Sequence, residues 1–384
     1  MLTAVTTDRL AATALPTVFY ITGGGTAAIP ALLEHGDGSK FFVEAQVPYD
    51  KNCVIELLDG YIPGAACTAE TSSMLAVKAY QRAKHMVGMP DVVGVGVTTQ
   101  LKRVGVERPD RTHKSHLTIH GQKRTFRATL ELQKGIRSRR DEEAIIADFI
   151  VKQYCSYMGV PSLSPPLYRP SEQPLCEEAC APFPWDWNAK TDYEQVYAQT
   201  LPDAAVQSDY DPFEIDGPII FSGSFNPVHQ GHIKLAEHAA NKMGRPVWFE
   251  ISLDNCTKPS FDWVSLRHRL ESFDQHKDNS AIAGFIITRF PTFVEKARLF
   301  TRPVFVTGYD TISRMDNPIF YRKPTLHIDA INELIRREAT FLVYNRKGTT
   351  ETPFRHNGLN LICTFIKDYK DSGENSTDLR KPCQ

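Results

Sequence analysis

One stretch of the chain, residues 218–240 with the sequence PIIFSGSFNPVHQGHIKLAEHAA, restricts the possible folds more than any other. Its apolar start at 218–221 predicts a short buried strand, and apolar residues recur at helical spacing over 233–243. The segment between them carries Gly223 and Gly231, which permit tight turns. A strand, a short loop and a helix in this order predict a unit of an α/β fold.

The same loop predicts an anion site. Small residues let backbone N–H groups come close to a ligand, and the following helix presents the positive end of its dipole to the loop. His229 and His232, three residues apart, bring two imidazole donors to the same place. Such donors suit a phosphate chain that gains charge in a transition state. We therefore expect both histidines to be catalytic.

The loop resembles the signature of the HxGH nucleotidylyltransferases and is most similar to that of nicotinamide mononucleotide adenylyltransferases. The positions that match in order and spacing are Gly223, Ser224, Phe225, Asn226, Pro227, His229, Gly231 and His232. The resemblance implies that Gly223, Ser224, Phe225, Asn226 and Gly231 bind the nucleotide. Cytidylyltransferases share this signature, so the choice between ATP and CTP stays open.

Two later motifs resemble further landmarks of this family, in the family's order. Gly308 and Asp310 in GYDTI are similar to its GxDxL segment, whose acidic residue lies near the nucleoside and can accept hydrogen bonds from ribose. Ser376, Thr377 and Arg380 in NSTDLR resemble its SSTxxR element. That element implies a helix start that faces phosphate and a catalytic cation, here Arg380, one turn later.

Two basic residues match the family less specifically. Lys258 and, in the following helix, Arg267 lie where adenylyltransferases carry cations near the nucleotide and its phosphates. A solvated surface charge explains each equally well, because lysine and arginine are mostly exposed in proteins. We include Lys258 among the expected nucleotide-binding residues.

Strand and helix patterns alternate through the rest of residues 217–384 and predict a Rossmann-like domain with a parallel sheet. Strands are expected at 246–252, 285–290 and 340–348, a strand followed by a turn at 303–312, and helices at 262–273, 292–300 and 328–337.

Residues 1–160 predict a second α/β domain by the same alternation. Strands are expected at 18–22, 41–47, 92–98, 117–121 and 125–132, and helices at 27–33, 69–86 and 140–157. In the helix at 69–86, the spacing places Met74, Val77, Tyr80, Ala83 and Met86 on the inward face. The GVGV run lacks a third glycine that opens a helix, so it predicts a packed strand rather than a dinucleotide-binding loop.

About residues 15–157 resemble the CinA C-terminal domain, whose active members deamidate nicotinamide mononucleotide. The similarity is carried by the order of elements, TGG at 22–24, the VPY that ends at Tyr49, GVGVTTQL at 94–101 and GIRSRRDEEAIIADFIV at 135–151.

Two departures from the CinA pattern predict that this domain lacks deamidase activity. The family's nucleophilic serine aligns with Tyr20, and its lysine, five residues after Tyr49, aligns with Val54. Such an amidohydrolase needs a hydroxyl nucleophile beside a base. Thr22 or Thr26 is an alternative nucleophile, but the sequence identifies no base near either. A strand end followed by a glycine turn explains the segment better.

Residues 161–216 predict a linker, because their many prolines prevent long regular elements. Residues 169–216 carry eleven acids against two Lys/Arg, whereas residues 102–140 carry twelve Lys/Arg against three acids. A nucleic-acid surface is disfavoured, since only Phe126 supplies a ring for stacking. We expect the linker to lie over the basic face, with its tryptophans Trp185 and Trp187 docked on a domain.

Composition excludes several classes of partner. The formal net charge is −1, which argues against a global polyanion partner, and no run of about 18 apolar residues exists to span a membrane. The N-terminus lacks a secretory pattern, so the cytoplasm is the expected compartment, with organelle targeting as a weak alternative. The eight cysteines have no repeated spacing. Cys176 and Cys180 lack a second ligand pair, so no metal site is expected.

These patterns predict a nucleotidylyltransferase that joins a nucleoside monophosphate from ATP or CTP to a small phosphorylated acceptor and releases pyrophosphate. Nicotinamide mononucleotide is the leading acceptor, because both halves resemble proteins of that pathway. Magnesium would enter with the triphosphate. The expected partners are small molecules, and a homo-oligomer through the N-terminal domain is an option. Two alternatives stay open: a non-catalytic nucleotide sensor or scaffold, and a bifunctional protein whose N-terminal domain deamidates by another residue.

Overall fold

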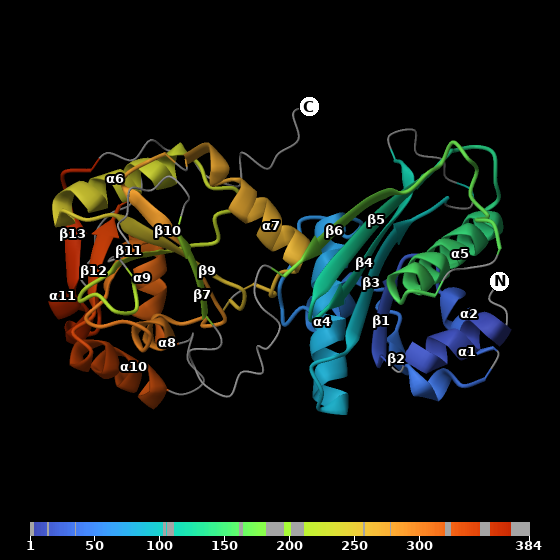
Figure 1. Ribbon diagram of the computed structural model, residues 1–384, viewed down its shortest axis with the longest axis horizontal. Helices are drawn as coiled ribbons and strands as arrows, with labels where there is room; N and C mark the ends of the chain where they lie inside the picture. The colour runs from blue at the N-terminus through green and yellow to red at the C-terminus, as the bar shows by residue number, and fades with distance from the viewer. Residues whose placement is uncertain are drawn as a thin grey trace. The chain divides into compact units, whose positions relative to one another are not determined.

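The computed structural model divides the chain into two units, which are described separately (Figure 1). The first contains Met1–Pro182 and Thr257–Arg267, and the second Phe183–Cys256 and His268–Gln384. The structure describes residues 4–13, 15–34, 36–102, 105, 111–160, 164–181, 196–200, 211–255, 258–276, 278–318, 324–345 and 354–369. None of the helices in these ranges has the length and apolar character that a membrane crossing requires.

The first unit is a mixed sheet with helices on both faces, which confirms the α/β class. The strand order is β2-β1-β3-β4-β5-β6, with β1 parallel to β2 and β3 and the remaining pairs antiparallel. Its elements are α1 (Ala4–Thr13), β1 (Thr17–Thr22), α2 (Ala28–Leu33), the 3-10 turn η1 (Gly38–Lys40), β2 (Phe42–Gln46), α3 (Lys51–Leu57), α4 (Ala69–Val87), β3 (Val93–Gln100), β4 (His113–Gly121), β5 (Arg124–Leu132), α5 (Arg139–Tyr157) and β6 (Leu175–Cys180).

Helix α4 lies against β3 at backbone contact distance. A Cβ atom at Gly94 would lie 2.1 Å from the Ala76 carbonyl oxygen and 2.1 Å from the Tyr80 nitrogen. A Cβ atom at Gly96 would lie 2.2 Å from the Ser72 carbonyl oxygen. Only glycine fits at these positions, so the GVGV run is a packed strand, as predicted.

This close approach changes which residues of α4 face inward. Val77 and Ala83 are buried as predicted, but Met86 is 53% exposed, so its predicted position is wrong. Ala76 and Ala79 are fully buried instead. A prediction from hydrophobic spacing places the largest apolar side chains inward. Here the glycines of β3 let α4 approach so closely that the small side chains of the helix, the alanines, face the strand instead.

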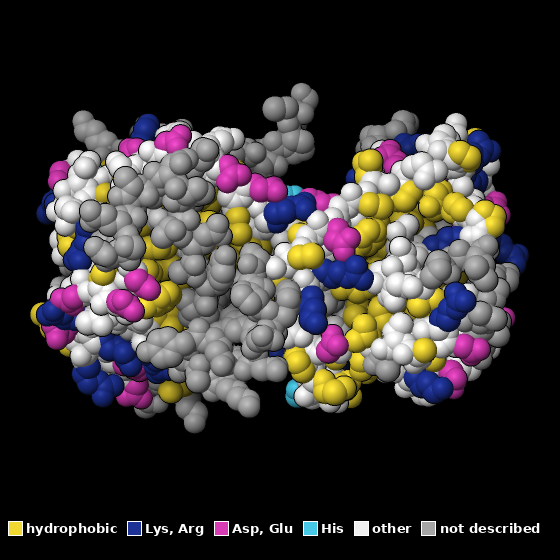
Figure 2. Space-filling view, in the orientation of Figure 1, with side chains coloured by type: hydrophobic (Ala, Val, Ile, Leu, Met, Phe, Trp, Pro, Cys, Tyr) yellow, Lys and Arg dark blue, Asp and Glu magenta, His cyan; other side chains and the backbone are white. Residues whose placement is uncertain are grey.

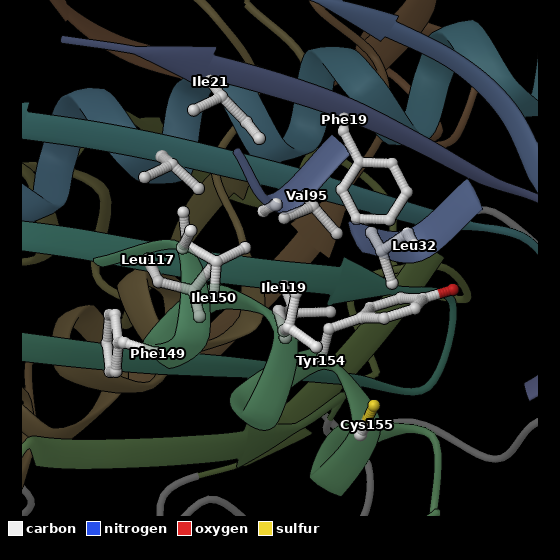
Figure 3. Packing of buried hydrophobic residues seen from close by; sticks show 14 of the residues in the cluster. Phe19, Ile21, Leu32, Val95, Leu117, Ile119, Phe149, Ile150, Tyr154 and Cys155 are labelled. Carbon is white, nitrogen blue, oxygen red and sulfur yellow. The ribbon is translucent and has the colours of Figure 1, made fainter. Parts of the chain in front are cut away.

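The opposite face of this sheet packs against α5 and forms the larger core of the unit. Figure 3 shows Ile150 and Tyr154 from α5 beside Phe19, Leu117 and Ile119 from the strands, and all five belong to one buried cluster. The Tyr154 hydroxyl lies 2.8 Å from the hydroxyl of a buried threonine in β1, so it is hydrogen-bonded inside the core. Burial raises the pKa of Tyr154 well above its ordinary value.

Part of the predicted linker belongs to the first sheet. Strand β6 pairs antiparallel with β5, and the first unit continues to Pro182 rather than ending at the predicted residue 160. Proline excludes long elements, but this short strand fits between Pro174 and Pro182. Cys176 and Cys180 lie four residues apart in it, so their Cα atoms are roughly 13 Å apart, too far for both thiols to bind one metal ion.

A segment expected in the C-terminal domain also belongs to the first unit. Thr257–Arg267 is assigned to this unit, and within it the Trp263 indole N–H donates to the Gly121 carbonyl of β4 at 3.1 Å. The Asp262 carboxylate, which is fully buried, pairs with Arg127 at 2.6 Å. Helical spacing at 262–273 indicates an amphipathic helix but not the sheet that its apolar side covers.

The acidic linker contacts the basic stretch where the structure describes both. Glu172 forms two hydrogen bonds of 2.6 Å with the Arg137 guanidinium, and Glu178 pairs with Arg124 at 3.0 Å. The prediction that the linker lies over the basic face is confirmed for these pairs. Trp185 and Trp187 lie outside the described residues.

Basic and acidic side chains are interspersed on the face of the molecule in Figure 2. On that face, no broad area of described side chains is basic alone.

The second unit has the Rossmann strand order. The sheet runs β13-β12-β11-β8-β9-β10-β7, in which β8 to β13 are mutually parallel and β7 adds antiparallel to β10. Counted from β8 along the chain, the parallel strands follow the order 3-2-1-4-5-6. The elements are β7 (Val196–Thr200), β8 (Ile219–Ser222), α6 (Gln230–Met243), β9 (Val247–Ser252), the 3-10 turn η3 (Asp274–His276), β10 (Ile282–Thr288), α8 (Phe293–Ala297), β11 (Val304–Gly308), α9 (Tyr309–Met315), α10 (Pro324–Arg336), β12 (Thr340–Tyr344), α11 (Asn357–Ile362) and β13 (Cys363–Ile366). Helix α7 (Trp263–Glu271) begins in the first unit and belongs to the second from His268 on.

The main differences from the predicted elements concern short segments. The strand predicted at 285–290 is Ile282–Thr288, and the helix predicted at 292–300 is the shorter Phe293–Ala297. Helix α11 and strand β13 were not predicted, because each is too short to show a clear hydrophobic period.

Gly94→Ala tests the contact between α4 and β3. The added methyl group would meet helix backbone at 2.1 Å, so we expect the free energy of unfolding to fall by about 1–3 kcal/mol. Urea denaturation measures the change. The control is Gly64→Ala, where a Cβ atom meets nothing within 4 Å. Equal effects of the two substitutions would contradict the packing argument.

The Glu172 contacts predict a pH dependence of stability. Burial raises the pKa of Glu172, but hydrogen bonds from Arg137 and from backbone N–H groups outweigh it and lower the pKa to about 2 from an ordinary 4.5. The stabilisation is therefore fully present above pH 4.5 and is lost as the pH falls toward 2. Glu172→Gln should lower the free energy of unfolding at pH 7 by about 1.5–3 kcal/mol.

In that experiment, the difference between wild type and Glu172→Gln should shrink when urea denaturation is repeated at successively lower pH. Exposed Glu131 provides the control substitution, Glu131→Gln, which should leave stability within about 0.5 kcal/mol. A difference that stays constant down to the lowest accessible pH would show that charge is not its cause.

Candidate active site

The candidate site lies at the point in the second sheet where the strand order reverses. The chain runs from β8 to β9 and β10 on one side, then crosses to β11 on the other side of β8. Helices leave β8 and β11 on different sides at such a switch point, so ligands bind outside the carboxyl ends of these two strands. The loop at 223–229 follows β8, and Gly308 ends β11. The topology therefore brings these two predicted motifs to one edge.

Gly223 connects the 223–229 loop to the sheet. Its N–H donates to the Glu250 carbonyl of β9 at 3.0 Å. A Cβ atom at Gly223 would lie 2.6 Å from the ring of Phe225, so glycine is needed because this ring folds back over it. The sequence prediction of a tight loop at Gly223 therefore has a specific cause.

Phe225 is a core residue of the loop. It has a φ angle of 39°, and its ring is 1% exposed. The ring packs against those of Phe249 at 4.9 Å and His232 at 5.0 Å between centroids. Its side chain is thus engaged in packing, and only its backbone is left to contact a nucleotide.

The two histidines stand at the start of α6. The His229 N–H donates to Nδ1 of His232 at 3.3 Å, and the ring centroids are 3.7 Å apart. Because Nδ1 accepts, neutral His232 carries its proton on Nε2. His232 can therefore donate from Nε2, as the expected role at a phosphate chain requires.

The remaining residues of the loop differ in exposure. Ser224 is exposed, Asn226 is half-buried, and the Asn226–Pro227 peptide bond is cis. Gly231 lies in the first turn of α6, where its carbonyl accepts a hydrogen bond of 3.4 Å from the Tyr369 hydroxyl. This contact brings the C-terminal part of the described chain to the first turn of α6.

Two side chains in or just after α7 hold the loop, and neither was predicted from the sequence. Arg269, which is 9% exposed, donates from Nε to the Ser224 carbonyl at 3.0 Å. Ser272 accepts from the Val228 N–H at 3.1 Å. Both partners lie more than forty residues away in sequence, so no local motif could identify them.

Gly308 and Asp310 lie together at the start of α9. Gly308 is the N-cap residue, and Asp310 lies in the first turn. A Cβ atom at Gly308 would be 2.9 Å from Oδ1 of Asp310, so glycine allows this carboxylate to lie close to the end of β11. Both residues are half-buried, and a carboxylate in this place can accept hydrogen bonds from hydroxyl groups.

The other predicted residues are not brought to this edge by the described structure. Ser376, Thr377 and Arg380 lie outside the described residues. Lys258 is exposed and belongs to the first unit. Arg267 also belongs to the first unit, where its guanidinium donates to the Glu178 carbonyl at 2.6 Å and binds a glutamate side chain, so its comparison with a phosphate-binding cation is not supported.

The first unit carries a different arrangement at its glycine loop. Tyr20, at the position of the resembled nucleophile, is 3% exposed, and burial, followed by the charge of Glu44, raises its pKa. The sequence alone identifies no base near Thr26, but in the structure the Thr26 hydroxyl donates to the Glu143 carboxylate at 3.2 Å. The same carboxylate oxygen accepts the N–H groups of Gly25 and Thr26 at 2.8 and 2.9 Å. Glu143 thus occupies the donors of this loop.

The described ranges contain no group of three or more His, Cys, Asp or Glu residues arranged to hold a metal ion. The polar groups described above at the edge of the second sheet are hydrogen-bond donors, from the loop backbone and the two histidines, and one acidic acceptor, Asp310. Together they can bind phosphate oxygens and a hydroxyl-bearing ligand.

The C-terminal half of the chain is similar to a known family. Residues 220–381 match the family model described as cytidylyltransferase-like, which confirms the resemblance of the C-terminal half. No curated protein sequence matches the chain significantly. The same 220–381 match contains the predicted loop, GYDTI and NSTDLR.

Solved structures from the two predicted families show similarity of low overall score. A competence-damaged protein (CinA) superfamily protein from Escherichia coli has a TM-score of 0.32 and 17% identity, covering 40% of this chain and 87% of that chain. A Plasmodium falciparum nicotinic acid mononucleotide adenylyltransferase has a TM-score of 0.29 and 15% identity, covering 43% of this chain and 82% of that chain.

Arg269→Met tests the anchoring of the loop. The substitution keeps an apolar stem but removes the donor to Ser224, so we expect the free energy of unfolding to fall by about 1–3 kcal/mol. Urea denaturation measures this loss. Arg314→Met, at an exposed arginine of α9, is the control and should change stability by less than about 0.5 kcal/mol. Equal, small effects would mean that Arg269 does not hold the loop.

Proposed function

We propose that the C-terminal unit is a nucleotidylyltransferase. The observation that carries the proposal is the His229–His232 pair at the N-terminus of α6, directly beyond β8 at the switch point of a Rossmann-type sheet. The match of residues 220–381 to the cytidylyltransferase-like family supports the same reaction class. A sensor that only binds nucleotides would need the loop but not a donor with a defined tautomer.

In this proposal, a phosphate oxygen of the acceptor attacks the α-phosphorus of a nucleoside triphosphate. The new P–O bond forms in line as the bond to the β-phosphate oxygen breaks, and pyrophosphate leaves with the electron pair. The N–H groups of the loop and His232 Nε2–H donate to oxygens that gain charge in the transition state. The residues position and stabilise the reactants, and no covalent enzyme intermediate is required.

The substrates follow from the resemblance rather than from a specificity contact. Nicotinamide mononucleotide is the proposed acceptor, with ATP as the donor and CTP as the alternative. The triphosphate is proposed to arrive as its magnesium complex. Asp310 is proposed to accept from ribose, and Ser376, Thr377 and Arg380 to contact phosphate. Lys258 keeps its proposed nucleotide-binding role on resemblance alone.

For the N-terminal unit we propose no reaction. Buried Tyr20 replaces the resembled nucleophile, and Glu143 is bound by two backbone N–H groups that would otherwise be open to an anion. These observations favour a structural role over deamidation. Self-association through this unit is proposed as one form of that role. The protein is proposed to act on small molecules in the cytoplasm.

A pyrophosphate-release assay tests the transfer reaction. Wild-type protein with magnesium is incubated with ATP or CTP and, in turn, nicotinamide mononucleotide or pantetheine phosphate. We expect turnover with at least one pair and a loss of about 10²–10³-fold in kcat for His232→Ala, because one donor to the developing charge is removed. His85→Ala, an exposed histidine of α4, should retain wild-type turnover.

The same incubations are assayed for ammonia, and none is expected from nicotinamide mononucleotide. Absence of pyrophosphate with every pair, while a nucleotide still raises the melting temperature, would favour the sensor alternative. Equal turnover of His232→Ala and wild type would remove His232 from the mechanism.

A further inference from the structure

Polar side chains cross the second sheet on one face just below its carboxyl edge. Side chains alternate along a strand, so Ser222, Glu250, Thr288 and Thr307 lie on the same face as the apolar residues two positions before them. Those apolar residues, Ile220, Trp248, Ile286 and Phe305, belong to one core cluster. The register aligns Ser222 with Glu250 on adjacent strands. The row therefore separates an apolar core from the switch-point edge.

Glu250 is the charged member of this row and is completely buried. Its carboxylate accepts from the Thr288 hydroxyl at 2.5 Å and pairs at 2.8 Å with Lys296 of α8. Lys296 is itself only 6% exposed, and its ammonium group lies 5.4 Å from the Phe293 ring centroid. Two charges are thus held in a predominantly apolar layer.

Stability alone does not account for this pair. Removing two charges from water is unfavourable, and well-packed apolar residues of similar volume often replace a buried ion pair without loss of stability. The surrounding cluster is rich in aromatic and aliphatic side chains that would accept such residues. A function that depends on the position of Glu250 is the better explanation.

The backbone of Glu250 is hydrogen-bonded to the start of the 223–229 loop. Its carbonyl accepts the Gly223 N–H at 3.0 Å, the first hydrogen bond beyond β8. Lys296 and Thr288 hold the side chain of the same residue from α8 and β10. On the loop itself, Arg269 holds the Ser224 carbonyl. The loop backbone before the histidines is therefore held at Gly223 by Glu250 and at Ser224 by Arg269 of α7.

We propose that Lys296 and Glu250 are positioning residues for nucleotidyl transfer. They hold the end of β9, and through it Gly223, so that the loop and His232 face the triphosphate in one geometry. The proposal rests on the transferase function proposed above, but its structural step, restraint of Gly223, is independent of it. A displacement of about 1 Å at reacting groups can reduce turnover by about 10²-fold.

The test compares an apolar replacement of the pair with wild type. Glu250→Leu combined with Lys296→Met removes both charges while keeping similar volume. We expect a melting temperature within a few degrees of wild type, amide hydrogen exchange at Gly223 at least about tenfold faster, and a kcat lowered by about 10–10²-fold with a smaller change in KM. The single variant Lys296→Arg keeps the charge at this position and should retain most of the wild-type kcat.

Two further variants complete the test. Thr288→Val removes one hydrogen bond to Glu250 with little change in volume and should show a smaller change in the same direction, even if the double variant does not fold. Arg298→Met removes the exposed pair with Glu333 and should leave exchange and turnover unchanged.

A folded double variant with wild-type exchange and kcat would overturn the proposal. So would wild-type exchange in Thr288→Val if the double variant does not fold. If wild-type protein transfers no nucleotide to any acceptor, the proposed function fails, and exchange at Gly223 still decides whether the pair restrains the loop.

Discussion

The hydrogen bond from Gly223 to the Glu250 carbonyl is the link between the sheet and the proposed chemistry of the second unit. It directs the chain out of β8, and the ring of Phe225 then packs over Gly223 where a side chain would otherwise lie. The turn that results places His229 before the first residue of α6. The tautomer of His232 depends on this turn, because its Nδ1 atom accepts the His229 N–H.

Close approach of backbone is used in both units, with different consequences. In the first unit, Gly94 and Gly96 admit the backbone of α4 and make a dense core. At its other glycine loop, Glu143 takes the backbone donors of Gly25 and Thr26. In the second unit, the glycine at 223 leaves room for a ring of the same loop. Glycines in the sequence therefore indicate a close approach of other atoms. The segments that fold next to them decide whether those atoms belong to a helix backbone, a carboxylate or an aromatic ring.

Much of the architecture could be predicted because the signals are local. The α4 and α6 helices carry enough turns for their period to be visible, and Gly88 and Gly244 end them in a left-handed conformation. The expected β-strand at 92–98 and the loop after β8 rest on residues that are adjacent in sequence. The candidate site was predictable to the same extent, since the histidine pair and Gly308 with Asp310 are each contained in a short motif.

Other features depend on contacts between distant segments. Phe225 matched a nucleotide-binding motif, but its ring fills the core because Phe249 and Phe273 surround it. Arg269 carries no motif of its own and gains its role from the Ser224 carbonyl. The segment at 257–267 has the pattern of a loop and a helix start in the C-terminal domain, yet it belongs to the first unit.

The order of residues was sufficient to establish the two α/β units and the strand, loop and histidine pair at 218–232, because each depends on neighbours within a few turns of chain. Tertiary structure alone decided that this loop lies at a switch point and that Nδ1 of His232 accepts the His229 N–H. It also decided that a buried Lys296–Glu250 pair lies beneath the loop. These properties depend on strand order and on packing across the sheet, which residues far apart in sequence determine jointly.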